Sequence, residues 1–106
     1  MNPKWRDLEH VLETHVPSGT VTTFGDISAH FFNGRRGLGQ PIAAMLRALA
    51  AHGDVDLTHR VVCDDGSLPD GRAGGTANHR AALEGEGVTF NQNGRVNIAA
   101  HLAHLA

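Results

Sequence analysis

The residues with the clearest chemical potential lie in one short stretch near the middle of the chain. Thr58 supplies a hydroxyl immediately before His59, and the residues that follow, up to Val62, have the β-branched character of a strand. A threonine hydroxyl is a far weaker nucleophile near neutral pH than a thiolate. Cys63 carries the only thiol of the chain, and we expect it to be a small buried hydrophobe rather than a reactive group.

Eight histidines raise the question of a metal site. His101 and His104 are three residues apart near the C-terminus, and His59 and Cys63 have the spacing His-x3-Cys. Neither pair completes a four-ligand set with acids or cysteines at known spacings. The sequence therefore predicts no metal and no cofactor.

The bulk composition predicts one globular domain that spans residues 1–106. The chain is 41% hydrophobic and 19% charged, with no apolar run long enough to cross a bilayer. We expect no secretory leader, because no charged segment followed by an apolar one opens the chain. A single cysteine excludes an internal disulfide and favours a reducing cytoplasm.

The charge is unevenly distributed along the chain. A formal net charge of −2 argues against a general polyanion binder. The segment Thr14–Gly53, however, contains a single acidic residue, Asp26, and three arginines, Arg35, Arg36 and Arg47. Such a small basic face suits weak phosphate contacts rather than long-range capture of DNA.

The first half of the chain predicts three helices, over residues 2–15, 24–32 and about 41–52. Asn2-Pro3 starts the first helix. Thr23 with Asp26 starts the second, and Asn33-Gly34 ends it. Pro41 lies in the first turn of the third, which ends at Gly53. The second and third helices, joined by a tight turn, form a helix-turn-helix candidate.

The second half predicts a strand, a helix and a hairpin. The strand covers Leu57–Cys63, and a glycine-rich loop follows an Asp65-Gly66 turn. A helix begins at Thr76 or Asn78 and ends near Gly85, and residues 88–97 form a hairpin around Asn91–Gly94. A short helix covers residues 98–106. The expected fold is mainly α with a small β component, of the winged helix-turn-helix type.

Five motifs occur in the order and with the spacing found in the O6-alkylguanine-DNA alkyltransferases. They are Val16–Ile27, similar to the family's (I/V)-P-x-G-x-V-(S/T)-(T/S)-Y-G-(D/E)-I opening, the helix segment Ala44-Met45, the segment His59–Cys63, the glycine-rich Gly71–Gly75, and Ala82–Val88, similar to L-x-x-E-G-V. Residues 93–98 resemble the tail of bacterial alkyltransferase-like proteins. The resemblance covers roughly residues 5–98.

In the alkyltransferases a cysteine precedes the histidine and accepts the alkyl group, whereas this chain carries Thr58 there. It therefore resembles the alkyltransferase-like proteins, which keep the DNA-binding domain and lack that cysteine. This resemblance implies a non-enzymatic monomer that binds a modified base, of the O6-alkylguanine type, in duplex DNA. It also implies approach through the minor groove, nucleotide flipping, marking of the lesion for nucleotide excision repair proteins, and a place at the bacterial nucleoid.

The resemblance also assigns DNA contacts to the second and third helices. Phe24 matches a tyrosine that rotates the target nucleotide; it keeps the bulk and loses the hydroxyl, and a plain core aromatic is the alternative. Gly39 matches the intercalating arginine, which leaves the unstacking cost of roughly a few kcal/mol without compensation. Arg35, Arg36 or Gln40 could fill the gap, or both arginines could bind phosphates. Small residues and one cation complete this surface: Gly37, Ala43, Ala44 and Arg47.

The implied base pocket comprises Thr58, His59, Arg60, Arg72, Ala73, Gly74 and Glu86. His59 and Glu86 match the pair that activates the family's cysteine through water. A hydrolytic Thr58-His59-Glu86 triad is one alternative, but the sequence provides no argument for an oxyanion hole. The favoured interpretation is that His59, Arg60 and Glu86 hold the strand and the helix end together.

Two further functions fit the same residues. A regulatory or protein-interaction module could keep the fold and lose damage recognition, as Gly39, Phe24 and the negative net charge suggest. A residual enzyme could transfer an alkyl group slowly to Cys63, or hydrolyse a substrate at Thr58.

Overall fold

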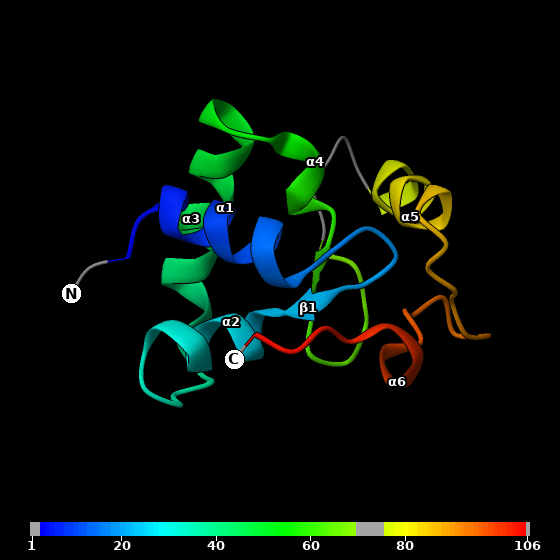
Figure 1. Ribbon diagram of the computed structural model, residues 1–106. Coiled ribbons are helices and arrows are strands. Elements are labelled where there is room, and N and C mark those ends of the chain that lie inside the picture. Colours follow the sequence, from blue (N-terminus) through cyan, green and yellow to red (C-terminus); the bar gives the residue numbers. More distant parts are fainter. Residues whose placement is uncertain (1–2, 70–75, 106) are drawn as a thin grey trace.

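The computed structural model describes residues 3–69 and 76–105. Figure 1 shows the elements, which follow in the order α1 (Trp5–His15), β1 (Thr22–Thr23), α2 (Phe24–Phe31), α3 (Gly39–His52), α4 (Val55–Thr58), β2 (Val61–Val62), α5 (Thr76–Gly85) and α6 (Ile98–His101). The fold is mainly helical with a small sheet, as the sequence predicts. In these two stretches of chain no helix is long and apolar enough to cross a membrane.

The three helices predicted for the first half are confirmed, but the first begins later than predicted, at Trp5, and the third begins earlier, at Gly39 rather than at about residue 41. The N-cap of α1 is Lys4, whose backbone N–H donates to Asp7 Oδ2 at 2.8 Å, so the helix begins after the predicted Asn2-Pro3. The predicted cap of α2 is present, since Thr23 Oγ1 accepts from the Asp26 N–H at 3.1 Å. After α2, Asn33 and Gly34 adopt φ values of 55° and 86°, the left-handed region that reverses the chain before α3.

The strand predicted over Leu57–Cys63 is wrong in its first half: Leu57 and Thr58 belong to the one-turn helix α4 (Val55–Thr58), and His59 and Arg60 form a turn. Asp54 Oδ1 caps this helix by accepting from the Asp56 N–H at 3.1 Å. At its other end Thr58 Oγ1 donates to the Val55 carbonyl at 2.6 Å. Local side-chain bonds to the backbone thus override the β propensity of the segment, and only Val61–Val62 remains a strand.

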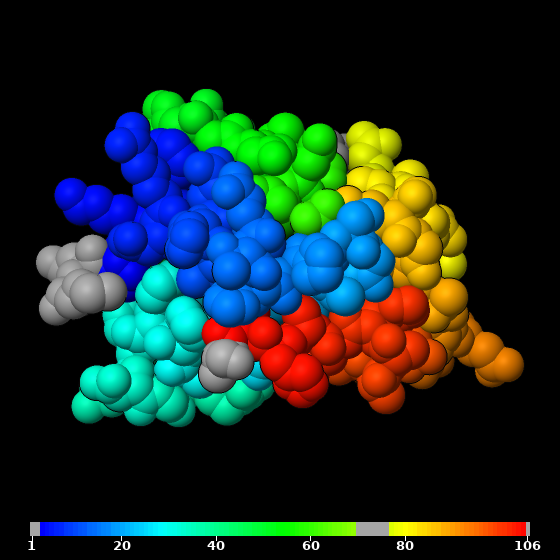
Figure 2. Space-filling model, in the orientation of Figure 1, coloured from blue at the N-terminus to red at the C-terminus, as the bar shows by residue number. Residues whose placement is uncertain are grey.

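The C-terminal helix is shorter than predicted, because the chain is extended after α6. Residues 102–105 run beside Val21, whose N–H donates to the His101 carbonyl at 2.9 Å and whose carbonyl accepts from the Ala103 N–H at 2.8 Å. Ala103 and Leu105 are buried there. In Figure 2 this red tail lies between the surface of α2, in cyan, and the blue N-terminal segment. The predicted hairpin is present as a Phe90–Val96 bridge.

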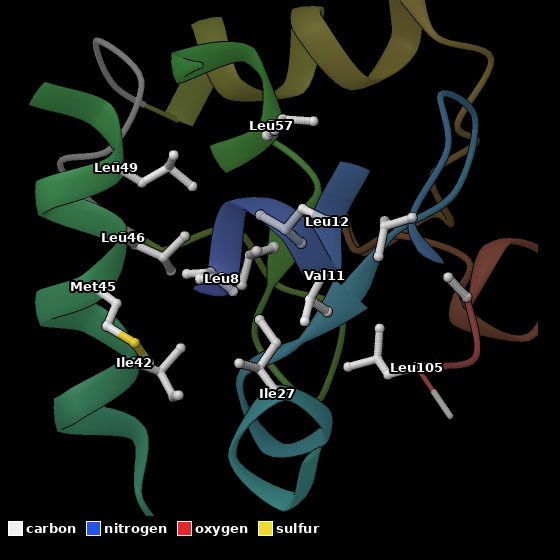
Figure 3. Packing of buried hydrophobic residues seen from close by; sticks show 13 residues of the cluster. Leu8, Val11, Leu12, Ile27, Ile42, Met45, Leu46, Leu49, Leu57 and Leu105 are labelled. Atoms are coloured by element: carbon white, nitrogen blue, oxygen red, sulfur yellow. The ribbon is translucent and has the colours of Figure 1, made fainter. Parts of the chain in front are cut away.

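The two-stranded sheet separates two hydrophobic clusters. Strands β1 and β2 are parallel, with Thr22 opposite Val61 and Thr23 opposite Val62. Because successive side chains of a strand point to opposite faces, Val61 joins the larger cluster and Val62 the smaller. In the larger cluster the side chains of α3 face those of α1 (Figure 3); the labelled residues on these two helices are Ile42, Met45, Leu46, Leu49, Leu8, Val11 and Leu12.

Candidate nucleic-acid interface

Helix α3 separates a buried apolar face from an exposed face of small residues. The buried side chains are Ile42, Met45, Leu46 and Leu49. Gln40, Ala44 and Arg47 are exposed and lie one helical turn apart on the other side, with Ala43 partly buried beside them. The solvent-exposed face of α3 therefore has short alanine side chains at its centre and one cationic side chain, Arg47.

The packing around position 39 does not require a glycine. Gly39 is the first residue of α3, and a Cβ added there would meet no atom within 4 Å. The same holds for Gly37 in the preceding turn. These glycines leave open space in front of the helix, where a larger side chain would fit without displacing the fold.

Phe24 begins α2 and is partly buried. Its side chain packs against the larger core cluster, as do those of Phe31 and Phe32. The packing fits the alternative of a core aromatic, and the partial exposure at the N-terminus of α2 leaves the DNA contact a prediction.

The two arginines of the α2–α3 turn have different surroundings. Arg36 Nη1 binds Asp26 Oδ1, and its Nη2 lies 3.7 Å from Asp64 Oδ2. The hydrogen bond with Asp26 raises the pKa of Arg36. Arg35 is exposed, and its backbone carbonyl accepts from the buried hydroxyl of Ser28. Arg36 is therefore held against carboxylates, while Arg35 projects from a turn whose backbone is fixed.

Ser28 fixes this turn through a second contact. Its Oγ also accepts from the Leu38 N–H at 3.1 Å, one residue before α3. Beside the turn lies a hollow of about 660 Å³ lined by His30, Phe31, Phe32, Asn33, Arg35 and Leu38. Asn33 and Arg35 therefore line the same hollow as Leu38, the N-cap residue of α3.

Thr58 is 3% exposed at the end of α4. Its hydroxyl donates to the Val55 carbonyl, so the proton of that hydroxyl is committed to the backbone. Cys63, beyond β2, is only partly buried, whereas the sequence predicted a buried residue. Three other residues of the predicted pocket, Arg72, Ala73 and Gly74, lie outside the described residues.

Arg60 and Glu86 form a closely bonded ion pair. Arg60 Nη2 lies 2.8 Å from Glu86 Oε2, its Nε lies 3.1 Å from Oε1, and its Nη1 donates to the Val16 carbonyl at 3.1 Å. The hydrogen bond with Glu86 raises the pKa of Arg60. The carboxylate matched to the triad thus binds a guanidinium, which supports the interpretation that Arg60 and Glu86 hold elements together.

His59 packs against a histidine that the sequence interpretation missed. His79 is fully buried in α5, and its Nε2 lies 2.7 Å from the His59 carbonyl, with the two rings 5.8 Å apart. Nothing in the sequence links these positions, because they lie 20 residues apart and α5 has only a weak apolar pattern. Within residues 3–69 and 76–105, no group of three or more His, Cys, Asp and Glu side chains could hold a metal ion.

Comparison with solved structures identifies the fold. The crystal structure of S. pombe Atl1 in complex with damaged DNA containing O6-carboxymethylguanine matches this chain with a TM-score of 0.65 and 23% sequence identity. The match covers 89% of this chain and 87% of the Atl1 chain. No family model matches the sequence, and no curated protein matches it. The mainly helical chain with its small two-stranded sheet therefore has the same fold as Atl1.

Proposed function

We propose that this protein binds duplex DNA without catalysis and recognises a modified base of the O6-alkylguanine type. The observation that carries the proposal is the exposed face of α3, where Gly39, Ala43 and Ala44 leave the helix backbone accessible and Arg47 supplies a cation. A helix without bulky side chains can approach the floor of the minor groove closely. Atl1, whose fold this chain shares, was crystallised with DNA that contains O6-carboxymethylguanine.

The geometry around Thr58 supports binding rather than catalysis. A nucleophilic hydroxyl needs a base to take its proton, and the Thr58 hydroxyl instead donates to the Val55 carbonyl. Glu86, which would have to orient a histidine base, is bound by Arg60. Thr58, His59 and Arg60 then serve as walls and supports of a base pocket, to which we assign Arg72, Ala73 and Gly74 as further lining residues.

In the proposed complex the residues around α2 and α3 share the remaining work. Arg35 and Arg47 bind phosphates, and Phe24 displaces the target nucleotide sterically. The protein acts as a monomer in the cytoplasm, and the bound lesion is marked for nucleotide excision repair proteins. In this proposal Gln40 contacts a base edge in the minor groove, which its exposure in the first turn of α3 supports.

The test is a binding panel by fluorescence anisotropy. Labelled duplexes of one sequence carry guanine, O6-methylguanine or O6-carboxymethylguanine and are titrated over a salt series. We expect the protein to bind a modified duplex about tenfold more tightly than the guanine duplex, which is a difference in binding free energy of about 1.4 kcal/mol. Arg47→Ala should weaken all duplexes alike and reduce the salt slope by about one. Equal affinity for the three duplexes at every salt concentration would contradict the proposal.

A protein-interaction module on the same fold is the second candidate. It is favoured by the net charge of −2 and by the two carboxylates that surround Arg36, because both features weaken attraction to DNA. The same panel separates the candidates. Absence of binding to every duplex at low salt, with the protein folded by circular dichroism, would favour the interaction module.

A further inference from the structure

Three side chains from distant parts of the sequence form an ionic cluster beside the start of α2. We call Asp26, Arg36 and Asp64 the Arg36 clamp. Arg36 comes from the turn before α3, Asp26 from the first turn of α2, and Asp64 from the loop after β2. Arg36 Nη1 binds Asp26 Oδ1, and Nη2 lies 3.7 Å from Asp64 Oδ2. The clamp therefore joins the helix-turn-helix segment to the loop that follows the sheet.

Asp64 is held in the clamp by the backbone of α2. The Gly25 N–H donates to Asp64 Oδ1 at 2.8 Å, at the helix end where the macrodipole favours a negative charge. A Cβ at Gly25 would lie 2.3 Å from Asp64 Oδ2 and 2.8 Å from Arg36 Nη2. Position 25 thus has room only for glycine while the carboxylate and the guanidinium occupy these places.

The clamp carries more negative than positive charge. Two carboxylates surround one guanidinium, and Arg36 lies directly next to Arg35 in the turn that leads into α3. The Arg36 side chain is 55% exposed, so a phosphate can reach it from solvent. A phosphate must nevertheless compete with both carboxylates for the same N–H donors.

We propose that Asp26 and Asp64 mask Arg36 from DNA phosphates, and that a bound duplex takes Arg36 from Asp64. The proposal rests on the DNA-binding function proposed above. Asp64 is the partner that gives way, because its contact is 3.7 Å long and its side chain is 54% exposed, whereas Asp26 is 24% exposed and closely bonded. Arg35 then makes the first phosphate contact at this turn, and Arg36 adds a second only after the exchange.

The experiment compares two neighbouring carboxylates. Asp64→Asn removes the charge and keeps an oxygen that accepts from the Gly25 N–H. Asp65→Asn removes the same charge one residue further on, from a side chain whose partners are Ser67 and Arg95. At low salt we expect Asp64→Asn to raise duplex affinity about two- to fivefold and to steepen the salt slope by up to about one. Asp65→Asn should have a clearly smaller effect.

The dependence on Arg36 is tested by repeating both substitutions in an Arg36→Ala background. There Asp64→Asn should change affinity no more than Asp65→Asn does. Equal effects of the two substitutions in the native background, or an Asp64→Asn effect that persists without Arg36, would overturn the masking while leaving DNA binding intact. If the native protein and every variant fail to bind any duplex while remaining folded by thermal unfolding, the proposed function falls together with the masking.

Discussion

Arg60 and Glu86 form the most deeply buried ion pair in the part of the chain that the structure describes. Their side chains are 14% and 20% exposed, and the guanidinium also donates to the Val16 carbonyl at the C-terminal cap of α1. A single arginine just before β2 therefore ties the end of α1 to the turn that follows α5. This places Arg60 and Glu86 among the residues that assemble the two halves of the fold.

Arg60→Ala should lower the free energy of unfolding by about 2–4 kcal/mol, because it leaves the Glu86 carboxylate and the Val16 carbonyl without their partner. Urea unfolding followed by circular dichroism measures this loss. Arg80→Ala is the control, since the Arg80–Glu84 pair is 44% and 53% exposed and should contribute less than about 1 kcal/mol. Similar losses in the two variants would contradict the structural role of Arg60.

Gly39→Arg should raise affinity for a modified duplex about three- to tenfold more than for the unmodified one. The open space at this position admits the side chain, which can then fill the stack that the flipped base vacates. Gly37→Arg is the matched control, because Gly37 is equally open and the added charge is the same. We expect it to strengthen binding to all duplexes alike, as anisotropy titrations would show. A similar gain in preference from both variants would argue against filling of the stack.

His101 joins three segments through both ring nitrogens. Its Nε2 accepts from the Thr89 N–H at 3.0 Å, which makes Nδ1 the protonated nitrogen that donates to the Gly19 carbonyl at 3.1 Å. His101→Ala should therefore cost about 1–3 kcal/mol of stability. The exposed His104 three residues later is the control, and its replacement by alanine should cost less than about 0.5 kcal/mol. Thermal unfolding of both variants would show whether the losses differ in this way.

Asp65 should titrate below its ordinary pKa of 3.8. The Ser67 hydroxyl donates to Asp65 Oδ1 at 2.6 Å and the Ser67 N–H at 2.9 Å, and these bonds lower the pKa of Asp65. Because the folded state favours the carboxylate, the resulting stability is present above pH 3.8 and is lost as the pH falls through the lower, folded-state pKa. A carboxyl NMR titration measures the midpoint, and Ser67→Ala should return it part of the way. A midpoint at or above 3.8 would refute the prediction.

Thr58→Cys should not produce rapid alkyl transfer. Glu86 is already bound by Arg60, so a thiol at position 58 would lack an oriented base to take its proton. Intact-mass spectrometry after incubation with a duplex containing O6-methylguanine would detect transfer as an added methyl group. The native protein, with Cys63 as its thiol, is the control for the background reaction. Stoichiometric methylation of the variant would show that the site is catalytically assembled.

The sequence predicted the elements of the first half well because their signals are local. Thr23 caps α2 within its own turn, and Asn33-Gly34 adopt the backbone that their residue types favour. A local signal of the same kind lies at Asp54, three residues before the predicted strand, where a side-chain cap starts α4. Reading Asp54 as a cap would have shortened the predicted strand.

The candidate site was less predictable because its contacts are distant in sequence. Asp64 meets Gly25 across 39 positions, and Arg60 meets Glu86 across 26. The motif resemblance brought Arg60 and Glu86 into one region, but it gave no signal for Asp64 or for His79. The choice between Arg35 and Arg36, left open by the sequence, depends on carboxylates that only the folded chain places beside Arg36.

The bridge between Val21 and Leu102 has a consequence for how the chain folds during synthesis. Val21 precedes β1, yet both of its backbone groups are satisfied only by residues 101 and 103. Ala103 and Leu105 also complete the larger hydrophobic cluster. When the nascent chain has emerged only as far as α5, the larger hydrophobic cluster is therefore still open to water, and the backbone N–H and carbonyl of Val21 still lack these partners. Final closure must wait until residues 101–105 have left the ribosome.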